Sequence, residues 1–555
     1  MVAATNQPEA DRLLSFHIQR AEGLRNDRGI FESHCEEVAA YAMPMHRNTF
    51  LSHGWTMPYQ KKTDKQFDPT ATIAALRFAA VMESLLTPQA QTWHRLVPHD
   101  PMLKQNRQVR EYLERVNDLL YRYRNRPAAN FVAQMQLVYL GLGLYGNGSI
   151  FVDSHESGDG LRYRNIHLGE IYFSEDHQGR IDTFYRFFKM RAQEAVDRYG
   201  DALPDSIKKA AANPIMGKDE YVKYDFLHCV FPRSDYDPVR LDAKGMPYAS
   251  LHIALNDRKL VRESGYRSFP CPIGRYMQAP GEIYGRGPAM LVLPGIKVLN
   301  EEKKALIKQA HRALDPVLLV HDDGVLPPTV RSGATISGGV NADGRPLVQP
   351  LLTGTLAAGE NAMELERQAI NDAFLISLFQ ILLKTPQMTA TEVMERMREK
   401  GMLISPTVGR QNTELLGPMI ERELEVLSMQ GKLPPPPPIF QQAGLAYAVE
   451  YDSPMSRMQR AENASGFMRS LDTAINFARE TGDMSALDWF NIDVAMPALQ
   501  DINGAPVSWT STPEQVAAKR QARAEAQQQK QAVENAAGIS NAMETVGSLA
   551  KTSQE

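Results

Sequence analysis

Cysteine is scarce in this sequence, and the three that occur, Cys35, Cys229 and Cys271, lie far apart in a chain of 555 residues. So few thiols at such wide spacing cannot form a disulfide framework, which favours a reducing compartment. A secretory signal peptide is not predicted either, because the first residues, MVAATNQPEADRLL, lack a basic start followed by an apolar block.

Long hydrophobic runs are also missing. The longest, at 374–383, covers about half of the ~20 apolar residues that a membrane helix needs, and Ser377 and Gln380 interrupt it. We expect a buried helix there and no membrane insertion.

With 43% hydrophobic residues the chain can still fill large cores, and its length predicts about two to four domains.

A basic surplus is absent as well. The chain carries 61 Lys and Arg against 65 Asp and Glu, which gives a net charge of −4. Proteins that grip nucleic acid by neutralising its phosphates usually carry a positive excess. Any DNA partner is therefore expected to be held weakly and without sequence preference.

Catalytic and cofactor motifs are mostly missing. GLGLYG at 141–146 fits G-x-G-x-x-G, but a dinucleotide site needs a strand before it and a helix after it, and the reverse order is expected here. No P-loop pattern occurs, and VHDDG at 320–324 is more typical of a turn than of a metal site. We expect no catalytic residue, no cofactor and no metal. A nucleotide-dependent enzyme that uses 141–146 is kept as an alternative.

The sequence does contain a clear change of pattern along the chain. Apolar residues recur at helical spacing in the first third, which predicts helices at 11–43, 70–86, 104–123 and 131–145. Short alternating runs bounded by Gly, Asp and Asn then predict a β-rich insert at 148–275, with a helix at 191–199 before Gly200. The expected fold class is α+β and mainly helical.

In the second half, two long helices are expected to flank a small module. Helical spacing from Ile296 to Ala313 predicts a first helix that ends at Asp315 and Pro316. The segment 317–354 is rich in Gly, Pro and β-branched residues and predicts strands and turns. A second long helix is predicted at 358–383.

The second of these helices becomes apolar on nearly every side after Phe374, so several neighbours are expected to surround it. Another copy of the same chain is the simplest source of such neighbours, although a large core within one chain would also serve. We therefore predict that Phe374, Ile376, Phe379 and Leu383 lie at a subunit interface.

A short polar loop, KTPQMT, follows this helix. Lys384 suits the negative end of the helix dipole, Pro386 prevents continuation, and Thr389 with Glu392 forms a capping box that starts the next helix. A loop between such stiff supports is either a connector or an element presented to a partner.

Beyond a helix predicted at 410–430, the chain reads KLPPPPPIF, a stiff polyproline spacer at 434–438. Helices are predicted at 454–480 and 486–499. The segment from Pro513 onward is rich in Ala and Gln, so a helix can form there but buries little.

Three stretches resemble one known family. They are YGNGSIFVD at 145–153, the strand-rich run at 166–200, and PGEIYGRGPAMLVLPGIKVLNEEKK at 280–304. These residues resemble the portal proteins, or head-to-tail connectors, of short-tailed phages. The resemblance extends over about 14–430 and is most specific in the third stretch.

The resemblance implies a ring, typically of twelve subunits, at one capsid vertex, with a central channel for double-stranded DNA. It also implies a division of the chain into named regions. These are a wing at 1–286, stem helices at 287–314 and 356–383, a clip at 315–355, a tunnel loop at 384–391, helices returning to the wing and crown at 392–433, and a crown with a C-terminal helical region at 434–555. Lys384, Thr385, Gln387, Met388 and Thr389 would then line the channel.

The implied protein is a virion component and not an enzyme. The resemblance implies assembly in the host cytoplasm and docking first to the terminase large subunit, which supplies the ATPase, and later to tail adaptor or head-completion proteins. Major capsid and scaffolding proteins are further implied partners. A neck adaptor or other ring-forming structural protein is the alternative from the structural class.

Overall fold

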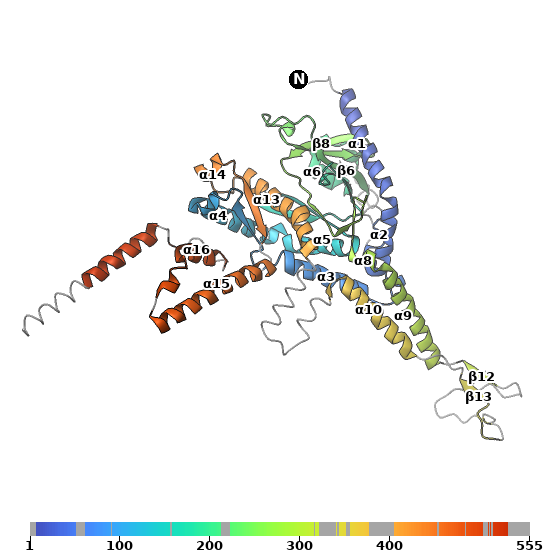
Figure 1. The fold of residues 1–555 in the computed structure, drawn as a ribbon. Coiled ribbons are helices and arrows are strands. Elements are labelled where there is room, and N and C mark those ends of the chain that lie inside the picture. The colour runs from blue at the N-terminus through green and yellow to red at the C-terminus, as the bar shows by residue number, and fades with distance from the viewer. Residues whose placement is uncertain are drawn as a thin grey trace, which may run out of the picture. The chain divides into compact units, whose positions relative to one another are not determined.

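The computed structural model describes residues 7–50, 62–89, 91–155, 158–212, 222–315, 317–320, 340, 343–350, 356–376, 405–451, 454–482, 484–502, 509, 511 and 514–530. They belong to two compact units, which are described separately. The first unit comprises Met1–Arg95, Val116–Pro435 and Val449–Met455, and the second comprises Leu96–Arg115, Pro436–Ala448 and Ser456–Glu555. Helices and sheets both occur, as predicted (Figure 1).

Most helices of the first unit lie where helical spacing predicts them. Their bounds are α1 Gln7–Asp27, α2 Gly29–Ala42, α3 Thr70–Leu86, α5 Phe131–Tyr145, α6 Ala192–Tyr199, α7 Asp205–Ala212, α8 Pro288–Leu291, α9 Leu293–Leu314, α10 Leu356–Ala373 and α13 Gly417–Met429, while α4 Arg107–Arg124 extends over both units. The bounds of α3 and α5 match the predictions. The single helix predicted at 11–43 is instead two, since a turn at Arg28 separates α1 from α2.

The strands β2 to β9 lie between Asn147 and Arg275, where alternating runs predict them. Their bounds are β2 Asn147–Ser154, β3 Leu161–Asn165, β4 Ile171–Glu175, β5 Ile181–Arg191, β6 Lys223–Pro232, β7 Tyr248–Ala254, β8 Lys259–Tyr266 and β9 Ile273–Arg275, and the shorter β10 Met277–Gln278 and β11 Gly285–Arg286 follow. They form a five-stranded sheet, β4-β5-β6-β7-β8, a three-stranded sheet, β3-β2-β9, and the pair β10-β11. All of these pairings are antiparallel.

Helix α1 covers one face of the five-stranded sheet. Its buried residues Leu14, Ile18 and Ala21 pack on alternate residues of the strands. The sheet residues in this cluster are Tyr172, Tyr185, Leu227, Cys229, Leu251 and Ile253. Alternation along a strand places these side chains on one face, so the residues between them point to the opposite face. On that opposite face, α6 and α7 cover one end around Phe226 and Ala254.

The glycines of GLGLYG serve close backbone packing. Gly146 ends α5 in a left-handed conformation (φ 70°), and a Cβ built on it would lie 2.3 Å from the carbonyl carbon of Arg286. Asn147 fixes the same contact, because its side chain accepts from the backbone N–H of Gly285 at 2.9 Å and donates to the Gly285 carbonyl at 3.0 Å. The motif forms the end of α5 and its cap, and strand β2 follows it, so the helix comes before the strand, as predicted, and this order does not build a dinucleotide site.

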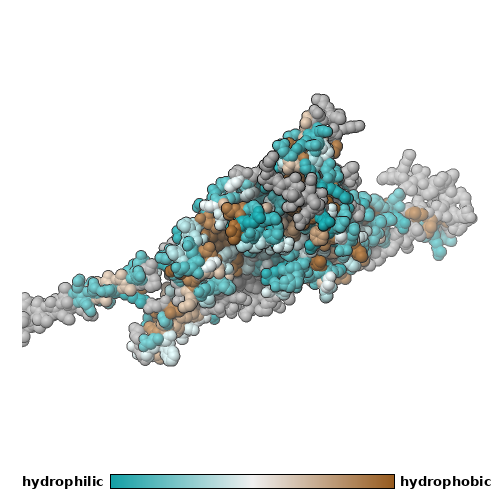
Figure 2. All heavy atoms as spheres, turned by 90° about the horizontal axis from the view of Figure 1, so that it is seen from above, coloured by the Kyte–Doolittle hydropathy of each residue, from teal (hydrophilic) through white to brown (hydrophobic). Residues whose placement is uncertain are grey.

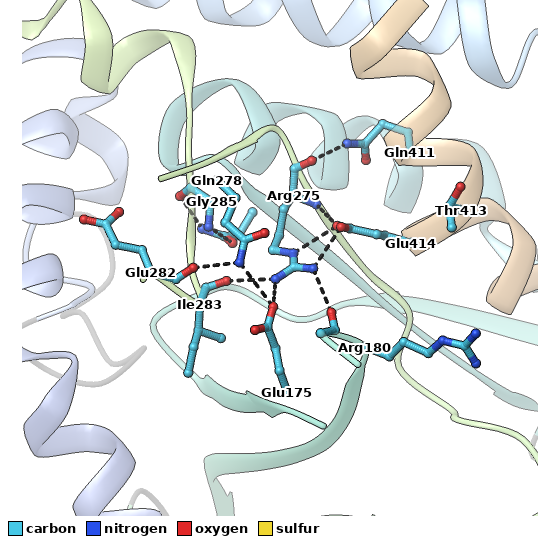
Figure 3. Close-up of polar contacts among 12 residues, drawn as sticks. Glu175, Arg180, Arg275, Gln278, Glu282, Ile283, Gly285, Gln411, Thr413 and Glu414 are labelled. Atoms are coloured by element: carbon cyan, nitrogen blue, oxygen red, sulfur yellow. Dashed lines mark hydrogen bonds and ion pairs between the residues drawn. The ribbon is translucent and has the colours of Figure 1, made fainter. Parts of the chain in front are cut away.

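Arg275 is a buried charge that joins distant parts of the first unit (Figure 3). Its Nε and Nη2 donate to the two carboxylate oxygens of Glu414 at 3.0 and 2.9 Å. Its Nη1 donates to Glu175 and to the Ile283 carbonyl (3.2 Å), and Nη2 also donates to the Gly179 carbonyl at 3.3 Å. All five guanidinium N–H groups are thus satisfied, which a buried arginine requires.

A second buried pair anchors helix α13. The side chains of Arg124 and Glu423 are both 0% exposed and form an ion pair. Tyr163 donates to Glu423 at 2.6 Å, and the guanidinium carbon of Arg124 lies 4.7 Å from the ring centre of Trp93. Burial, with Arg124 nearby, holds the pKa of His94 well below its ordinary value, so a neutral ring nitrogen accepts from Arg124 at 2.9 Å.

The second unit is smaller and contains α14 Pro438–Gln442, most of α15 Pro454–Thr481, α16 Ile492–Ile502 and a helix at 514–530. Pro434 to Pro437 are neither helix nor strand, as predicted, whereas Pro438 begins α14, where its missing N–H costs nothing. Tyr112 and Phe440 pack with their ring centres 5.8 Å apart. Nearly every residue of the helix at 514–530 is exposed, which confirms that it buries little.

The surface mixes polar and apolar residues. Figure 2 shows one face, on which hydrophobic residues are interspersed among hydrophilic ones. None of the helices within the described residues is long and apolar enough for a membrane span.

The packing at Gly146 leads to a first prediction. Gly146→Ala should lower the free energy of unfolding by about 3 kcal/mol or more, because the new Cβ meets backbone atoms as well as an unfavourable φ. Gly158→Ala is the matched control, since Gly158 has the same φ of 70° but no atom within 4 Å. Its cost should be about 1 kcal/mol. Urea unfolding measures both variants. If both lower the free energy of unfolding equally, the close backbone packing at Gly146 does not contribute to stability.

Candidate functional site

Helices α9 and α10 lie side by side and run antiparallel, with the strands β12 Leu318–Val320 and β13 Val348–Pro350 at their far end (Figure 1). Close approach is possible where one helix has a glycine. A Cβ on Gly295 of α9 would lie 2.8 Å from a carboxylate oxygen of Glu366 on α10, and one on Gly359 of α10 would lie 3.8 Å from Leu306 on α9. These contacts fix the register of the pair.

The two helices carry opposite charge. Helix α9 has five basic and two acidic side chains, a net charge of +3, and α10 has one basic and four acidic side chains, a net charge of −3. On α9, no described residue forms an ion pair with Lys303, Lys308 or Arg312. Each helix therefore presents a surplus of one sign.

Asn300 holds α9 against the start of α3. It is 4% exposed, and its side-chain oxygen accepts from the backbone N–H groups of Phe67 (2.7 Å) and Asp68 (3.2 Å). Its amide nitrogen donates to the Lys65 carbonyl at 2.5 Å. A buried amide with both groups satisfied specifies one docking position.

Arg367 holds α10 against the same place. It donates to Asp68 at 2.8 Å, and Asp68 also accepts from the backbone N–H of Thr70 at 2.9 Å. Burial alone would raise the pKa of Asp68, but the hydrogen bonds from Thr70 and Arg367 outweigh it and hold that pKa below its ordinary value. Asp68 therefore remains ionised. Its carboxylate binds Arg367 of α10 and its backbone N–H binds Asn300 of α9, so it connects both helices to the start of α3.

The second long helix ends earlier than predicted. Helix α10 stops at Ala373, and residues 374–375 form a turn in which Leu375 adopts a left-handed conformation (φ 61°). The prediction of an uninterrupted helix to Leu383 is wrong at this turn. The reason is tertiary, because the turn places Phe374 in the core of the same chain.

Phe374 and Ile376 are 0% and 3% exposed in the single chain. The ring of Phe374 packs edge-on against Phe78 of α3, with ring centres 6.1 Å apart, and Tyr276 packs against the same Phe78 at 5.9 Å. Gly143 makes room for Phe78, since a Cβ there would lie 2.6 Å from its ring. These two residues therefore find their apolar neighbours within the chain, and a second copy is not needed to bury them.

The chain beyond this turn is anchored again at residues 405–416. A helix at 405–411 passes into a π-helical turn at Asn412–Leu416, because Pro418 clashes with a regular helical turn and lacks an N–H. Gln411 donates to the Arg275 carbonyl at 2.7 Å, and the carboxylate of Glu414 holds the Arg275 side chain (Figure 3). The described chain is thus anchored by buried contacts both before residue 377 and after residue 404.

The other predicted site residues lie between these two anchors. They are Phe379, Leu383, Lys384, Thr385, Gln387, Met388 and Thr389, and all seven lie outside the described residues. Their predicted roles remain predictions.

The sequence periodicity did not reveal Arg275, Glu414 or Phe374 as anchors. For Arg275 and Glu414 a usable signal exists, because each is a charged residue within a predicted apolar strand or helix. Among the residues of known placement, no group of His, Cys, Asp and Glu could hold a metal ion.

Residues 16–510 match the model of one protein family, the bacteriophage head to tail connecting protein. The chain belongs to this family. It is 28% identical over 541 residues to the portal protein of Salmonella phage epsilon15, which covers 95% of this chain and 93% of the relative. It is also 28% identical over 546 residues to the probable portal protein of Bordetella phage BPP-1, with the same coverages.

Solved structures from gene transfer agent particles match at lower similarity. The neck of an empty particle aligns at 12% identity and a TM-score of 0.33, covering 76% of this chain and 87% of that chain. The virion of a native particle aligns at 11% identity and a TM-score of 0.32, covering 76% and 88%. The family match and the phage relatives confirm the predicted membership among portal, or head-to-tail connecting, proteins.

A second prediction follows from the burial of Phe374. Phe374→Ala should lower the free energy of unfolding of the dissociated chain by about 3–5 kcal/mol, because it leaves a cavity beside Phe78. Leu365→Ala, on the exposed side of α10 (69% exposed), should change it by less than about 0.5 kcal/mol. Denaturant unfolding at a concentration where the protein sediments as a monomer measures both. Unchanged stability of Phe374→Ala would mean that the residue is buried only between subunits.

Proposed function

We propose that this head-to-tail connecting protein forms a ring at one capsid vertex and that double-stranded DNA is packaged and ejected through its centre. The observation that carries the proposal is the family match, together with the buried anchors on both sides of residues 377–404, which are Phe374 before them and Gln411 and Glu414 after them. Such anchors allow the loop proposed at 384–391 to be presented from a rigid body.

The regions of the chain have corresponding roles in this proposal. The α9–α10 pair is the stem, and the module between the two helices, which includes β12 and β13, is the clip. The preceding helices and the two larger sheets form the wing, and residues 434–555 form the crown and a C-terminal helical region. Residues 384–391 are the tunnel loop, with Lys384, Gln387 and Met388 facing the DNA.

The opposite charges of α9 and α10 support a ring. In a closed ring each subunit presents one patch to its neighbour on one side and a different patch on the other. If α9 of one subunit faces α10 of the next, a helix of net charge +3 meets one of −3 at every interface. Phe379 and Leu383 are proposed to contribute apolar contacts to the same interface. A dodecamer is the expected assembly.

The acidity of the chain suits a conduit. A duplex carries one negative charge per about 1.7 Å, so a strongly basic wall would bind it tightly. A chain of net charge −4 with occasional lysines lets the duplex slide, because repulsion is screened within about 8–10 Å at physiological salt. The role is non-enzymatic, and the ATPase is a separate terminase.

The clip and the wing are proposed to bind different partners. The clip docks the terminase large subunit during packaging and tail adaptor or head-completion proteins afterwards. The wing contacts major capsid and scaffolding proteins. The assembled ring is then part of the virion, after assembly in the host cytoplasm. A neck adaptor without a packaging role is the second candidate, which the family description also admits.

Electron microscopy of the purified protein tests the assembly. The expected result is a closed ring with a central hole that admits a duplex, and labelled rings should map to the head side of the vertex. A hole too narrow for DNA would contradict the conduit, and a position on the tail side would identify an adaptor.

The tunnel loop leads to a further prediction. Replacing Gln387 and Met388 by Gly-Gly should leave ring assembly intact, because the buried anchors at Phe374 and Glu414 are unchanged, yet reduce the number of DNA-filled heads. A weak contact of these two side chains with DNA, repeated in every subunit, sums to a strong interaction around the duplex. The Gly-Gly replacement removes the side chains and with them this contact.

The matched control replaces Asn256 and Asp257 by Gly-Gly in the exposed turn between β7 and β8, which should leave filling unchanged. Filled heads are counted with rings whose shape has been verified by microscopy. Normal filling and retention of DNA with the Gln387-Met388 variant would show that the loop is only a connector.

A further inference from the structure

A large cleft lies between the five-stranded sheet and the hairpin β2–β3. Its volume is about 1460 Å³, and its walls come from both sheets, from α6 and from the loop that joins β6 to β7. This cleft occupies the part of the sheet's second face that α6 and α7 leave uncovered. None of its lining residues belongs to the segment 377–404, and the proposed function assigns it no role.

A row of four side chains crosses the sheet beneath the cleft, and three of them, Arg186, His252 and Arg262, line it. Arg186, His228, His252 and Arg262 are directly paired across β5, β6, β7 and β8, so they share one face of the sheet. The two histidine rings stack with centres 4.1 Å apart. Burial, with Arg198, Arg262 and Arg186 nearby, lowers the pKa of His252 to about 3, so the two rings between the arginines are neutral spacers.

Further arginines line the other walls. Arg162 and Arg164 come from β3, where Arg164 pairs with Phe151 of β2 and so points with it toward the floor. Arg198 comes from α6. The positive charge of Arg186, followed by burial, lowers the pKa of Arg164.

Three of these cations form no ion pair with a described residue. Arg186 is paired with Glu170 at 2.8 Å, and Arg162 donates to the Ala128 carbonyl at 3.3 Å. For Arg164, Arg198 and Arg262, by contrast, no hydrogen bond or ion pair is formed with any residue whose placement is described. Like charges gathered in a concave site raise the free energy of the empty site and favour an anion within it.

The remaining lining residues restrict what that anion can be. Met190, Leu241 and Met246 add apolar surface, and Leu241 is fully exposed. Acidic residues also line the cleft, namely Asp153, Glu194, Asp197, Asp242 and Glu263. A nucleic acid strand has a phosphate at every nucleotide and would be repelled by these carboxylates, whereas a peptide can place neutral side chains beside them. The volume holds about two turns of α-helix or an extended strand, and it is too small for a duplex.

We propose that this cleft, the arginine cleft, binds an acidic peptide segment of another protein, with carboxylates on Arg164, Arg198 and Arg262 and an apolar side chain against Leu241 and Met246. Arginine suits this role because its planar donors match a carboxylate with two hydrogen bonds. The occupant is a different protein and not a second copy. The acidic loop of this chain at 235–242 already pairs Asp235 with Lys244 and Asp242 with Arg240.

The test measures peptide binding to the full-length protein by fluorescence anisotropy. The probe is a fluorescein-labelled peptide of alternating Glu and Leu, compared with its Gln and Leu counterpart and with a single-stranded oligonucleotide of equal charge. We expect the acidic peptide to bind most tightly, and the double variant Arg164→Gln with Arg262→Gln to weaken it about tenfold or more. The lysine variants at both positions should retain part of the binding.

Arg77→Gln with Arg122→Gln is the matched control, since both arginines are exposed and lie outside the cleft. It should change the affinity by less than about twofold. Circular dichroism verifies folding, and if the double variant unfolds, Arg198→Gln on the surface of α6 replaces it. Equal binding of the Gln and Leu peptide, tighter binding of the oligonucleotide, or an unchanged affinity in the cleft variants would overturn the proposal. A change of oligomeric state in the cleft variants would instead identify a second copy as the occupant, and this too would overturn it.

Discussion

The burial of Arg275 is the constraint on which the first unit depends. A guanidinium that is 3% exposed is stable only if its donors are satisfied, and its partners come from β4, from the turn after β4, from the segment before β11 and from the π-helical turn. These parts are far apart in sequence, so the ion pairs form only when all of them are in place. The second buried pair, Arg124 with Glu423, adds the same requirement for α13.

Buried contacts also fix the described chain on both sides of residues 377–404. Asp68 and Asn300 dock the α9–α10 pair onto the start of α3, and Phe374 packs on the same helix. On the return, Glu414 binds Arg275. The described chain just before 377 and just after 404 is therefore part of one packed body.

Sequence patterns predicted the helices well where the burial of apolar residues at helical spacing determines the structure. The bounds of α3 and α5 follow from apolar periodicity, and the glycine after α5 marks its end. Periodicity failed at the end of α10, because Phe374 and Ile376 fit a helix pattern equally well whether they face a second subunit or their own core. The arginine cleft was also beyond prediction. It depends on the register of four strands, which pairs Arg186 with His228, and a shift by one residue would send these side chains to the face that α1 covers.

The left-handed residue at the end of α10 has a mechanical consequence. A continuous helix transmits bending and torsion along its axis as a stiff rod, and a bulky side chain at φ 61° interrupts it at a cost of about 1 kcal/mol. Force applied to the chain beyond Leu375 therefore reaches α10 through one backbone joint. Because Phe374 and Ile376, which flank this residue, are buried, part of that force is taken up by the core around Phe78 before it reaches α10.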